Sequence, residues 1–142
     1  MSDFAPIDAK ARASFARQTM MQTMGAELIE TAPGRCVIRA AIAPHLRQQH
    51  GAAHAGLAFT IGDSAAGYAA LTLMPEDSDV MTVEMKINLL SPAVGEALEA
   101  VGQVVRAGRR LSVVSAEVFA LTGETRKSIA LLQGTMIPVA PS

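Results

Sequence analysis

The stretch AGLAFTIGDSAAGYAALTLM, residues 55–74, is apolar at almost every position. It is about as long as a membrane-spanning helix. It nevertheless contains three glycines and an aspartate, Asp63, at its middle, and amphipathic strands follow it directly. We therefore interpret it as a buried helix of a soluble protein. A helix that is apolar nearly all round must be enclosed by other elements.

Strand patterns on both sides of this helix indicate what encloses it. Before it, residues 26–43 form a predicted hairpin that turns at Pro33-Gly34. After it come four further strand patterns, and turns through Gly108 and Gly123 make the last three antiparallel neighbours. These four predicted strands span about residues 83–89, 96–106, 111–121 and 128–139.

A helix is predicted over about residues 5–24, because Phe4, Ile7, Ala11 and Phe15 recur at helical spacing and Gly25 is a plausible stop. The order is therefore helix, two strands, long apolar helix, four strands. This order predicts an α+β protein with the hotdog fold, in which an antiparallel sheet curves around one long central helix. One domain is expected over residues 1–142. An ordinary α+β sandwich has a similar pattern and stays open as an alternative.

Composition narrows the function classes. Half of the 142 residues are hydrophobic, only 18% are charged, and the net charge is −1, so a general nucleic-acid binder is not expected. So few charges in so apolar a chain suggest surface buried in an oligomer. One cysteine, Cys36, excludes an internal disulfide and suits a reducing compartment. With no signal-peptide pattern at the start, we expect a cytoplasmic protein.

Asp63 is the first candidate for chemistry. A carboxylate in a helix built to be buried costs several kcal/mol unless it is paired or protonated. No Lys or Arg lies between Arg47 and Lys86, so no cation close in sequence can pair with it. Desolvation raises basicity and favours a general base or a nucleophile. The alternative is a structural carboxylate, hydrogen-bonded to a distant strand or capping a helix.

The start of the same helix is the second candidate. His54 precedes it, and the backbone N–H groups of Ala55 and Gly56 lie in a first turn where intrahelical partners are lacking. These donors and the helix dipole could stabilise a carbonyl oxygen that becomes an oxyanion. An ordinary loop-to-helix junction would have the same sequence, so both interpretations stay open.

The two candidates together resemble a known family. The segment is similar to the PaaI-type acyl-CoA thioesterases of the hotdog superfamily, which carry Asn or Gln, then Gly, then His-Gly-Gly, then an acid in Leu-Ala-Asp-Ser. The corresponding residues here are Gln48, Gly51, His54-Ala55-Gly56 and Ile61-Gly62-Asp63-Ser64.

Further resemblance follows in Thr82 to Pro92 and in Gly108-Arg109-Arg110-Leu111, and the whole covers roughly residues 25–138. The chain departs from the family at Ala55, which replaces a glycine, and at Gly67, where some relatives carry Ser or Thr. Thr82 matches a Ser/Thr position of other relatives.

The resemblance implies hydrolysis of an aryl- or fatty-acyl-CoA to free acid and coenzyme A, with no cofactor beyond the coenzyme A of the substrate. Asp63 would be the catalytic carboxylate, Ala55 and Gly56 would hold the acyl carbonyl, Gln48 would orient it, and His54 would shape the helix start. Basic residues near the hairpin turn would meet the coenzyme A phosphates, although a solvated surface cluster explains them as well. These are Arg106, Arg109 and Arg110.

The resemblance also implies a homodimer or homotetramer whose sheet edges pair. Gln48, His54 and Asp63 would then face a strand of the partner, which would supply Thr82. No nucleic-acid or membrane partner is expected. No metal is expected either, because the histidines at 45, 50 and 54 lie in or beside a loop without an acidic residue. Two rivals stay open: a non-catalytic acyl-CoA binder, and a hotdog hydratase or dehydratase.

Overall fold

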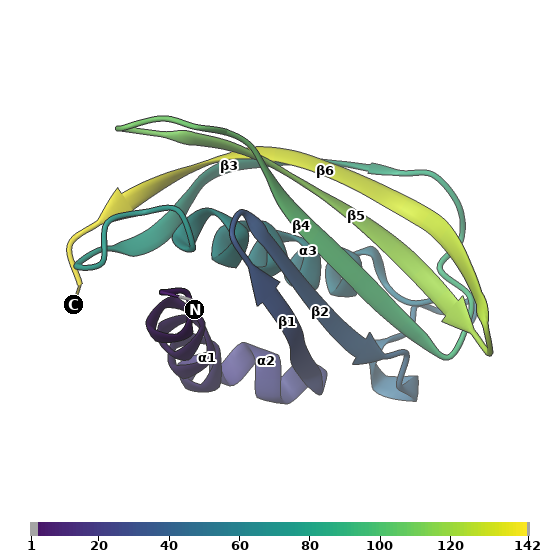
Figure 1. The fold of residues 1–142 in the computed structure, drawn as a ribbon. Coiled ribbons are helices and arrows are strands. Elements are labelled where there is room, and N and C mark those ends of the chain that lie inside the picture. Colours follow the sequence, from purple (N-terminus) through teal and green to yellow (C-terminus); the bar gives the residue numbers. More distant parts are fainter. Residues whose placement is uncertain (1–2, 142) are drawn as a thin grey trace.

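The computed structural model describes residues 3–141, and it confirms the expected sheet curved around one long helix (Figure 1). Six antiparallel strands form one sheet in the order β1-β2-β4-β5-β6-β3, so β1 and β3 are its edges. The helices are α1 (Ala5–Arg17), α2 (Thr19–Met24) and α3 (Ala55–Leu71), with a 3₁₀ turn at Pro44–Leu46. The strands are β1 (Ala26–Ala32), β2 (Arg35–Ala41), β3 (Asp79–Leu89), β4 (Ala97–Ala107), β5 (Ser112–Thr122) and β6 (Thr125–Val139).

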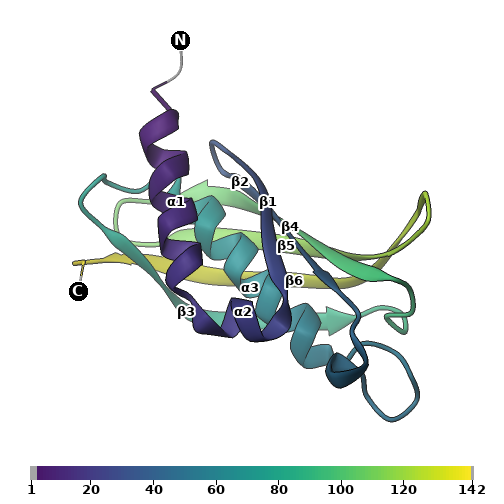
Figure 2. The same cartoon turned by 90° about the horizontal axis from the view of Figure 1, so that it is seen from below.

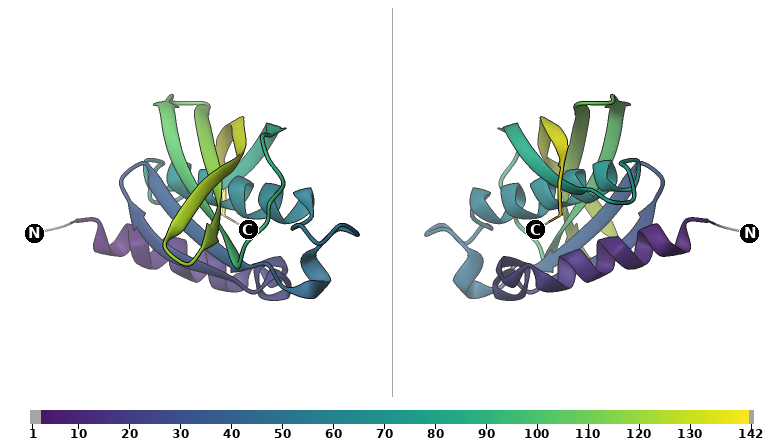
Figure 3. Two further views of the ribbon diagram at one scale, coloured as in Figure 1. Left: turned by 90° about the vertical axis from the view of Figure 1, so that its right-hand side faces the viewer. Right: turned by 90° about the vertical axis from the view of Figure 1, so that its left-hand side faces the viewer.

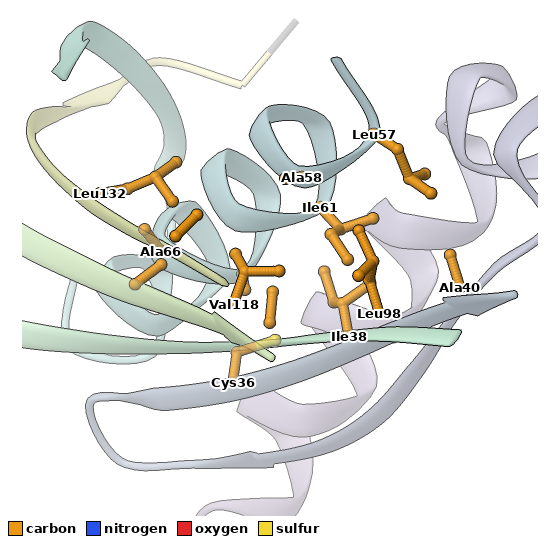
Figure 4. Packing of buried hydrophobic residues seen from close by; sticks show 14 of the residues in the cluster. Cys36, Ile38, Ala40, Leu57, Ala58, Ile61, Ala66, Leu98, Val118 and Leu132 are labelled. Atoms are coloured by element: carbon orange, nitrogen blue, oxygen red, sulfur yellow. The ribbon is translucent and has the colours of Figure 1, made fainter. Parts of the chain in front are cut away.

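Helix α3 lies against the inner side of the sheet, and α1 lies on the other side of α3 (Figures 1 and 3). The side chains of α3 form the core together with those of the central strands (Figure 4). Leu57, Ile61 and Ala65 of α3 are at most 1% exposed, as are Ile38 of β2 and Leu98 of β4. Among the described residues, no helix is long and apolar enough to cross a membrane. The interpretation of residues 55–74 as an enclosed helix is thus confirmed, although α3 ends at Leu71.

Gly102 of β4 is the point of closest approach between the helix and the sheet. A Cβ atom at this position would lie 2.3 Å from both the carbonyl carbon and the oxygen of Ala65, and 2.5 Å from the backbone nitrogen of Ala66. Only a residue without a side chain fits there, because the opposing atoms are backbone and cannot turn aside. The glycine on the strand and the alanines on the helix therefore set the depth at which α3 lies.

A β-bulge in β3 changes which side chains face the helix. Thr82 pairs with Met136 and Glu84 pairs with Thr135, so Val83 is an additional residue on this strand. Strict alternation would put Thr82 and Met85 on opposite faces, but the bulge turns both toward the helix. The alternation of Val83, Met85 and Ile87 in the sequence predicts one common face for them, and for Val83 this prediction is wrong: the bulge removes Val83 from that face and leaves it 56% exposed.

The N-terminal helix differs from the expected single helix over about residues 5–24. It breaks at Gln18, whose backbone is extended (φ −79°, ψ 97°), and α2 then ends at Gly25 in the left-handed region, as expected. The side chain of Gln18 donates to the hydroxyl of Tyr68 on α3, and Ser14 is hydrogen-bonded to the same hydroxyl. The break thus gives a polar side chain of the N-terminal segment access to the central helix. Seen from below, α1 crosses α3 at an angle (Figure 2), and the rings of Phe15 and Tyr68 lie 6.2 Å apart between the two helices.

We predict that Gly102→Ala destabilises the protein by about 1–3 kcal/mol or more, as overpacked cores do, because the new methyl group must push α3 away from the sheet. Gln103→Ala, at the exposed neighbouring position of the same strand, is the matched control. Chemical denaturation measures both free energies of unfolding. In an ordinary strand position glycine-to-alanine is neutral or stabilising, so an unchanged or higher stability would contradict the close contact.

Candidate active site

Asp63 lies in the middle of α3, and the hydroxyl of Thr82 donates to its Oδ1 at 2.7 Å. The same hydroxyl lies 3.2 Å from Sδ of Met136 on β6. The expectation that a partner subunit supplies Thr82 to Asp63 is therefore wrong: the bulge in β3 turns Thr82 toward α3 of its own chain. Asp63 and Thr82 line one side of a cavity of about 490 Å³ that extends along α3 toward α1.

The carboxyl of Asp63 is half-buried, and within residues 3–141 no cation pairs with it. Burial raises its pKa above the ordinary value of 3.8, and the hydrogen bond from Thr82 opposes this in part. None of the described residues that line the cavity is Lys, Arg or His, while a second carboxylate, Asp79, is among them. The site thus holds a carboxylate of increased basicity, with one oxygen oriented by a hydroxyl.

His54 caps the start of α3. Its Nδ1 accepts the backbone N–H of Gly56 at 2.8 Å, so the ring proton of the neutral side chain is on Nε2. This corrects the expectation for Gly56, whose N–H is used by the cap and is not available to a substrate. The N–H of Ala55 has no hydrogen bond in the described part of the chain. One free backbone donor, rather than two, remains at this helix start.

Gln48 supplies a second free donor near Ala55. Its Oε1 accepts the backbone N–H of His50 in a turn that Gly51 closes with φ +90°. Its amide NH₂ has no hydrogen bond within residues 3–141. Gln48, His54 and Ala55 line a second cavity of about 560 Å³, walled by the segment that follows β3. The structure therefore brings Gln48 and Ala55, two of the three residues expected to hold or orient a carbonyl oxygen, to one cavity.

The two cavities are separate in one chain. Ala55 and Asp63 are eight residues apart on a continuous helix, which corresponds to about 12 Å along its axis. A carbonyl oxygen bound at Ala55 cannot place its carbon next to Asp63 of the same helix. The expected arrangement, in which Gln48, His54 and Asp63 form one side of a single site, is therefore wrong for a single chain.

Arg106, Arg109 and Arg110 lie at the hairpin between β4 and β5, around a third cavity of about 320 Å³. All three are exposed and have no hydrogen bond or ion pair within the described residues. The hairpin lies at the Asp63 end of the sheet, because Ser112, Met136 and Thr82 pair in one row across three strands. Two strand spacings, about 10 Å, separate Ser112 from Thr82.

Other reactive side chains lie outside these cavities. Cys36 is fully buried, as expected for a core residue, and burial raises the pKa of its thiol to about 12. Within residues 3–141, no three side chains of His, Cys, Asp or Glu gather where they could hold a metal ion.

Three further residues that line the Asp63 cavity were not predicted from the sequence: Ser14, Gln18 and Tyr68. Ser14 and Gln18 are four apart on the predicted N-terminal helix, a spacing that is equally typical of a solvated face. The sequence therefore contains a weak signal for a shared face and none for the cavity.

The chain is similar in sequence and in structure to known proteins. The model of the thioesterase superfamily matches residues 50–127, more than half of the chain. A solved thioesterase family protein from Silicibacter pomeroyi is 42% identical, with a TM-score of 0.90, and the match covers 93% of this chain and 97% of that one. A conserved protein from Pseudomonas aeruginosa is 30% identical, with a TM-score of 0.78, covering 86% of this chain and 94% of that one.

The PaaI protein from the phenylacetic acid degradation operon of E. coli is 20% identical, with a TM-score of 0.87 and 99% of each chain covered. This likeness concerns the fold, and it confirms the predicted hotdog architecture. No curated protein matches the sequence significantly.

We predict that Asp63→Asn makes the protein more stable at neutral pH. Folding raises the pKa of this carboxyl. As the pH rises past 3.8, the Asp63 carboxyl therefore ionises more readily in the unfolded chain than in the folded one, and the free energy of unfolding falls. Below that pH both states are protonated and the difference disappears. Thermal midpoints of wild type and variant between pH 3 and pH 8 measure the effect.

The control for this comparison is Asp77→Asn, which removes the same charge from the exposed turn after α3. An Asp63→Asn variant less stable than wild type at neutral pH would contradict the desolvated carboxylate.

Proposed function

This chain belongs to the thioesterase superfamily, and we propose that it hydrolyses an acyl-coenzyme A thioester to a free acid and coenzyme A with Asp63 as the catalytic carboxylate. The observation that carries the proposal is the half-buried Asp63, without a cation, held by Thr82 at the wall of a cavity. The burial of this carboxylate in an apolar helix lowers stability. A reaction that needs a basic, desolvated carboxylate explains why it is there.

The chemistry follows from this one carboxylate. As a general base, Asp63 takes a proton from water while the water oxygen bonds to the acyl carbon. The C–S bond then breaks, and the sulfur leaves as the thiolate of coenzyme A, which the proton neutralises. As a nucleophile, Asp63 would itself bond to the acyl carbon, and water would hydrolyse the resulting anhydride. Thr82 orients one carboxylate oxygen in either route and leaves the other free to act.

The oxyanion that develops needs donors close to the same carbonyl. The free donors are the Ala55 N–H and the Gln48 amide, but Ala55 lies about 12 Å along α3 from Asp63 of the same chain, and Gln48 lines the cavity at Ala55. The proposed site therefore combines Ala55 and Gln48 of one protomer with Asp63 and Thr82 of the partner subunit. A two-fold symmetric dimer would form two such sites.

The exposed edge of the sheet supports a dimer. β3 has no neighbour on one side, and three of its apolar side chains are more than half exposed: Met81 (58%), Val83 (56%) and Leu89 (56%). An apolar edge strand left open in this way promotes pairing with another chain. Pairing of β3 with its copy would bring Asp63 and Thr82 close to the second protomer, because Thr82 is part of that edge.

Arg109 and Arg110 are proposed to bind the phosphates of coenzyme A. They lie at the same end of the sheet as Thr82 and have no partner in the described chain, so their guanidinium groups are free to bind an anion. Contacts with a remote phosphate are equally strong in the ground state and in the transition state. They therefore affect binding more than chemistry.

We predict that Asp63→Asn folds and loses at least about a hundredfold in kcat, since an amide cannot act as base or nucleophile. Thiol release from a panel of aryl- and fatty-acyl-CoAs measures it, with Asp77→Asn as the charge-matched control. Near-normal turnover by the Asp63→Asn variant would exclude the mechanism. A wild-type protein that releases no thiol from any member of the panel would exclude the function.

We further predict that replacing both Arg109 and Arg110 with Ala raises KM for acyl-CoA and changes kcat little. The comparison substrate carries the same acyl group on a short thiol that lacks the nucleotide, and its KM should not change. An equal effect on both substrates would make the arginines structural, and no effect on either would make them solvated surface.

A further inference from the structure

The two edge strands of the sheet differ in what binds their outer side, and β3 is the open one. The Leu90 N–H donates to the carbonyl of Ile129 on β6. Because bonded and outward-facing residues alternate along an antiparallel strand, Ile87 and Leu89 turn their backbone N–H and C=O groups away from β6. Within residues 3–141, no side chain binds these groups. A further strand could therefore pair with β3 without displacing anything.

On the other edge strand, β1, the backbone groups of Leu28 point away from the only neighbour, β2. The Ile42 N–H donates to Glu96 at the end of the β2–β4 ladder, so Ile38, four residues earlier, bonds to β4 as well. Leu28 lies opposite Ile38, in a pair that makes no backbone hydrogen bond between β1 and β2. The Leu28 carbonyl is thus one that a further strand would need as an acceptor.

An ion pair on α1 occupies this carbonyl. Nη1 of Arg12 donates to the Leu28 oxygen at 3.2 Å, and Nε of Arg12 lies 3.1 Å from both carboxylate oxygens of Asp8. The hydroxyl of Thr31, also on β1, donates to Asp8 Oδ1. The helices α1 and α2 both approach β1, and they lie beside it in Figures 1 and 2. A strand that docked on β1 would have to displace Arg12.

Other side chains anchor α1 independently of this ion pair. The Lys10 ammonium donates to the carbonyls of Glu76 and Ser78, in the turn that leads from α3 to β3. The Ser14 hydroxyl is hydrogen-bonded to that of Tyr68 on α3. The helix therefore remains attached without its contacts to β1, and removal of the ion pair opens the edge without releasing the whole helix.

The partner that such a cover keeps away is a second copy of this chain. Open edge strands promote pairing between copies, and two copies of β1 could pair antiparallel around a two-fold axis near Leu28. Each chain would then have two pairing edges, β1 and β3, and the sheet would extend from copy to copy without closing. With β1 covered, an assembly that pairs through β3 closes at two copies.

We propose that the Asp8–Arg12 pair on α1 prevents a second copy of this chain from pairing with β1, so that the sheet extends through β3 alone. The pairing through β3 rests on the proposed function, whereas the cover on β1 stands on the contacts of α1 itself.

The test uses Ile29→Cys as a reporter, because Ile29 follows Leu28 in β1 and is 37% exposed. The native Cys36 is buried and does not compete. The rate at which a mild oxidant links two copies through the new cysteine is measured with and without Asp8→Ala/Arg12→Ala. This double variant should cross-link about tenfold faster, as expected for the loss of one charge-assisted hydrogen bond. Without the reporter, its mass in light scattering should rise with concentration beyond that of wild type.

Two matched variants isolate the ion pair. Arg12→Lys keeps a cation that can donate to the Leu28 carbonyl, and it should cross-link at a rate close to wild type. Arg17 is exposed on the same helix and donates to Ala13 of that helix, so Arg17→Ala should also behave like wild type.

Equal cross-linking rates in wild type and Asp8→Ala/Arg12→Ala, or a mass that stays equal to that of wild type at every concentration, would refute the cover on β1. If the double variant unfolds, Arg12→Met gives the same comparison with Asp8 still bound to Thr31, and an unchanged rate there refutes the proposal as well. Thiol release from acyl-CoA should be unchanged in all of these variants. If wild type releases no thiol, the proposed function falls, while the cross-linking rates still decide whether Arg12 covers β1.

Discussion

The depth and straightness of α3 are the constraint on which the rest of the structure depends. Gly102 lets the helix backbone lie directly on β4, and Leu132 of β6 occupies the space beside Gly62. A helix fixed in this way is a rigid spacer, and it holds Ala55 and Asp63 about 12 Å apart. A free donor and a basic carboxylate on one rigid element cannot converge on one carbonyl. The need for a second protomer in the proposed mechanism follows directly from this spacing.

The edge strand β3 links stability, assembly and chemistry. Its bulge turns Thr82 toward Asp63, and Gly134 makes the bulge possible, because a Cβ there would lie 2.5 Å from the carbonyl oxygen of Glu84. The same strand leaves Met81 and Val83 exposed in the monomer. The open apolar edge and the desolvated carboxylate each lower the stability of the single chain. Both features are explained if a partner subunit covers the edge and completes the site.

Much of the fold and part of the candidate site could be predicted from the sequence, and each wrong prediction has a physical reason. Hydrophobic periodicity identified all six strands and the enclosed helix, and Asp63 stood out as the single acid in an apolar helix. The bulge was missed because its additional residue, Val83, is apolar and continues the alternation of Met85 and Ile87 without a break. The break at Gln18 was missed because neither Gly nor Pro marks it, and the hydrogen bond from Gln18 to Tyr68 that accompanies it joins residues far apart in sequence. The use of the Gly56 N–H by His54 depends on a side-chain rotamer, which sequence does not encode in any simple way.

The most direct test of the account is complementation between two inactive variants. Asp63→Asn removes the carboxylate, and Ala55→Val crowds the donor, so each homodimer should be inactive. A heterodimer with one subunit of each kind, purified by two tags, contains one doubly altered site and one unaltered site if the sites form between subunits. This heterodimer should have about half of the wild-type activity. A pure heterodimer as inactive as its parents would contradict a site shared between subunits.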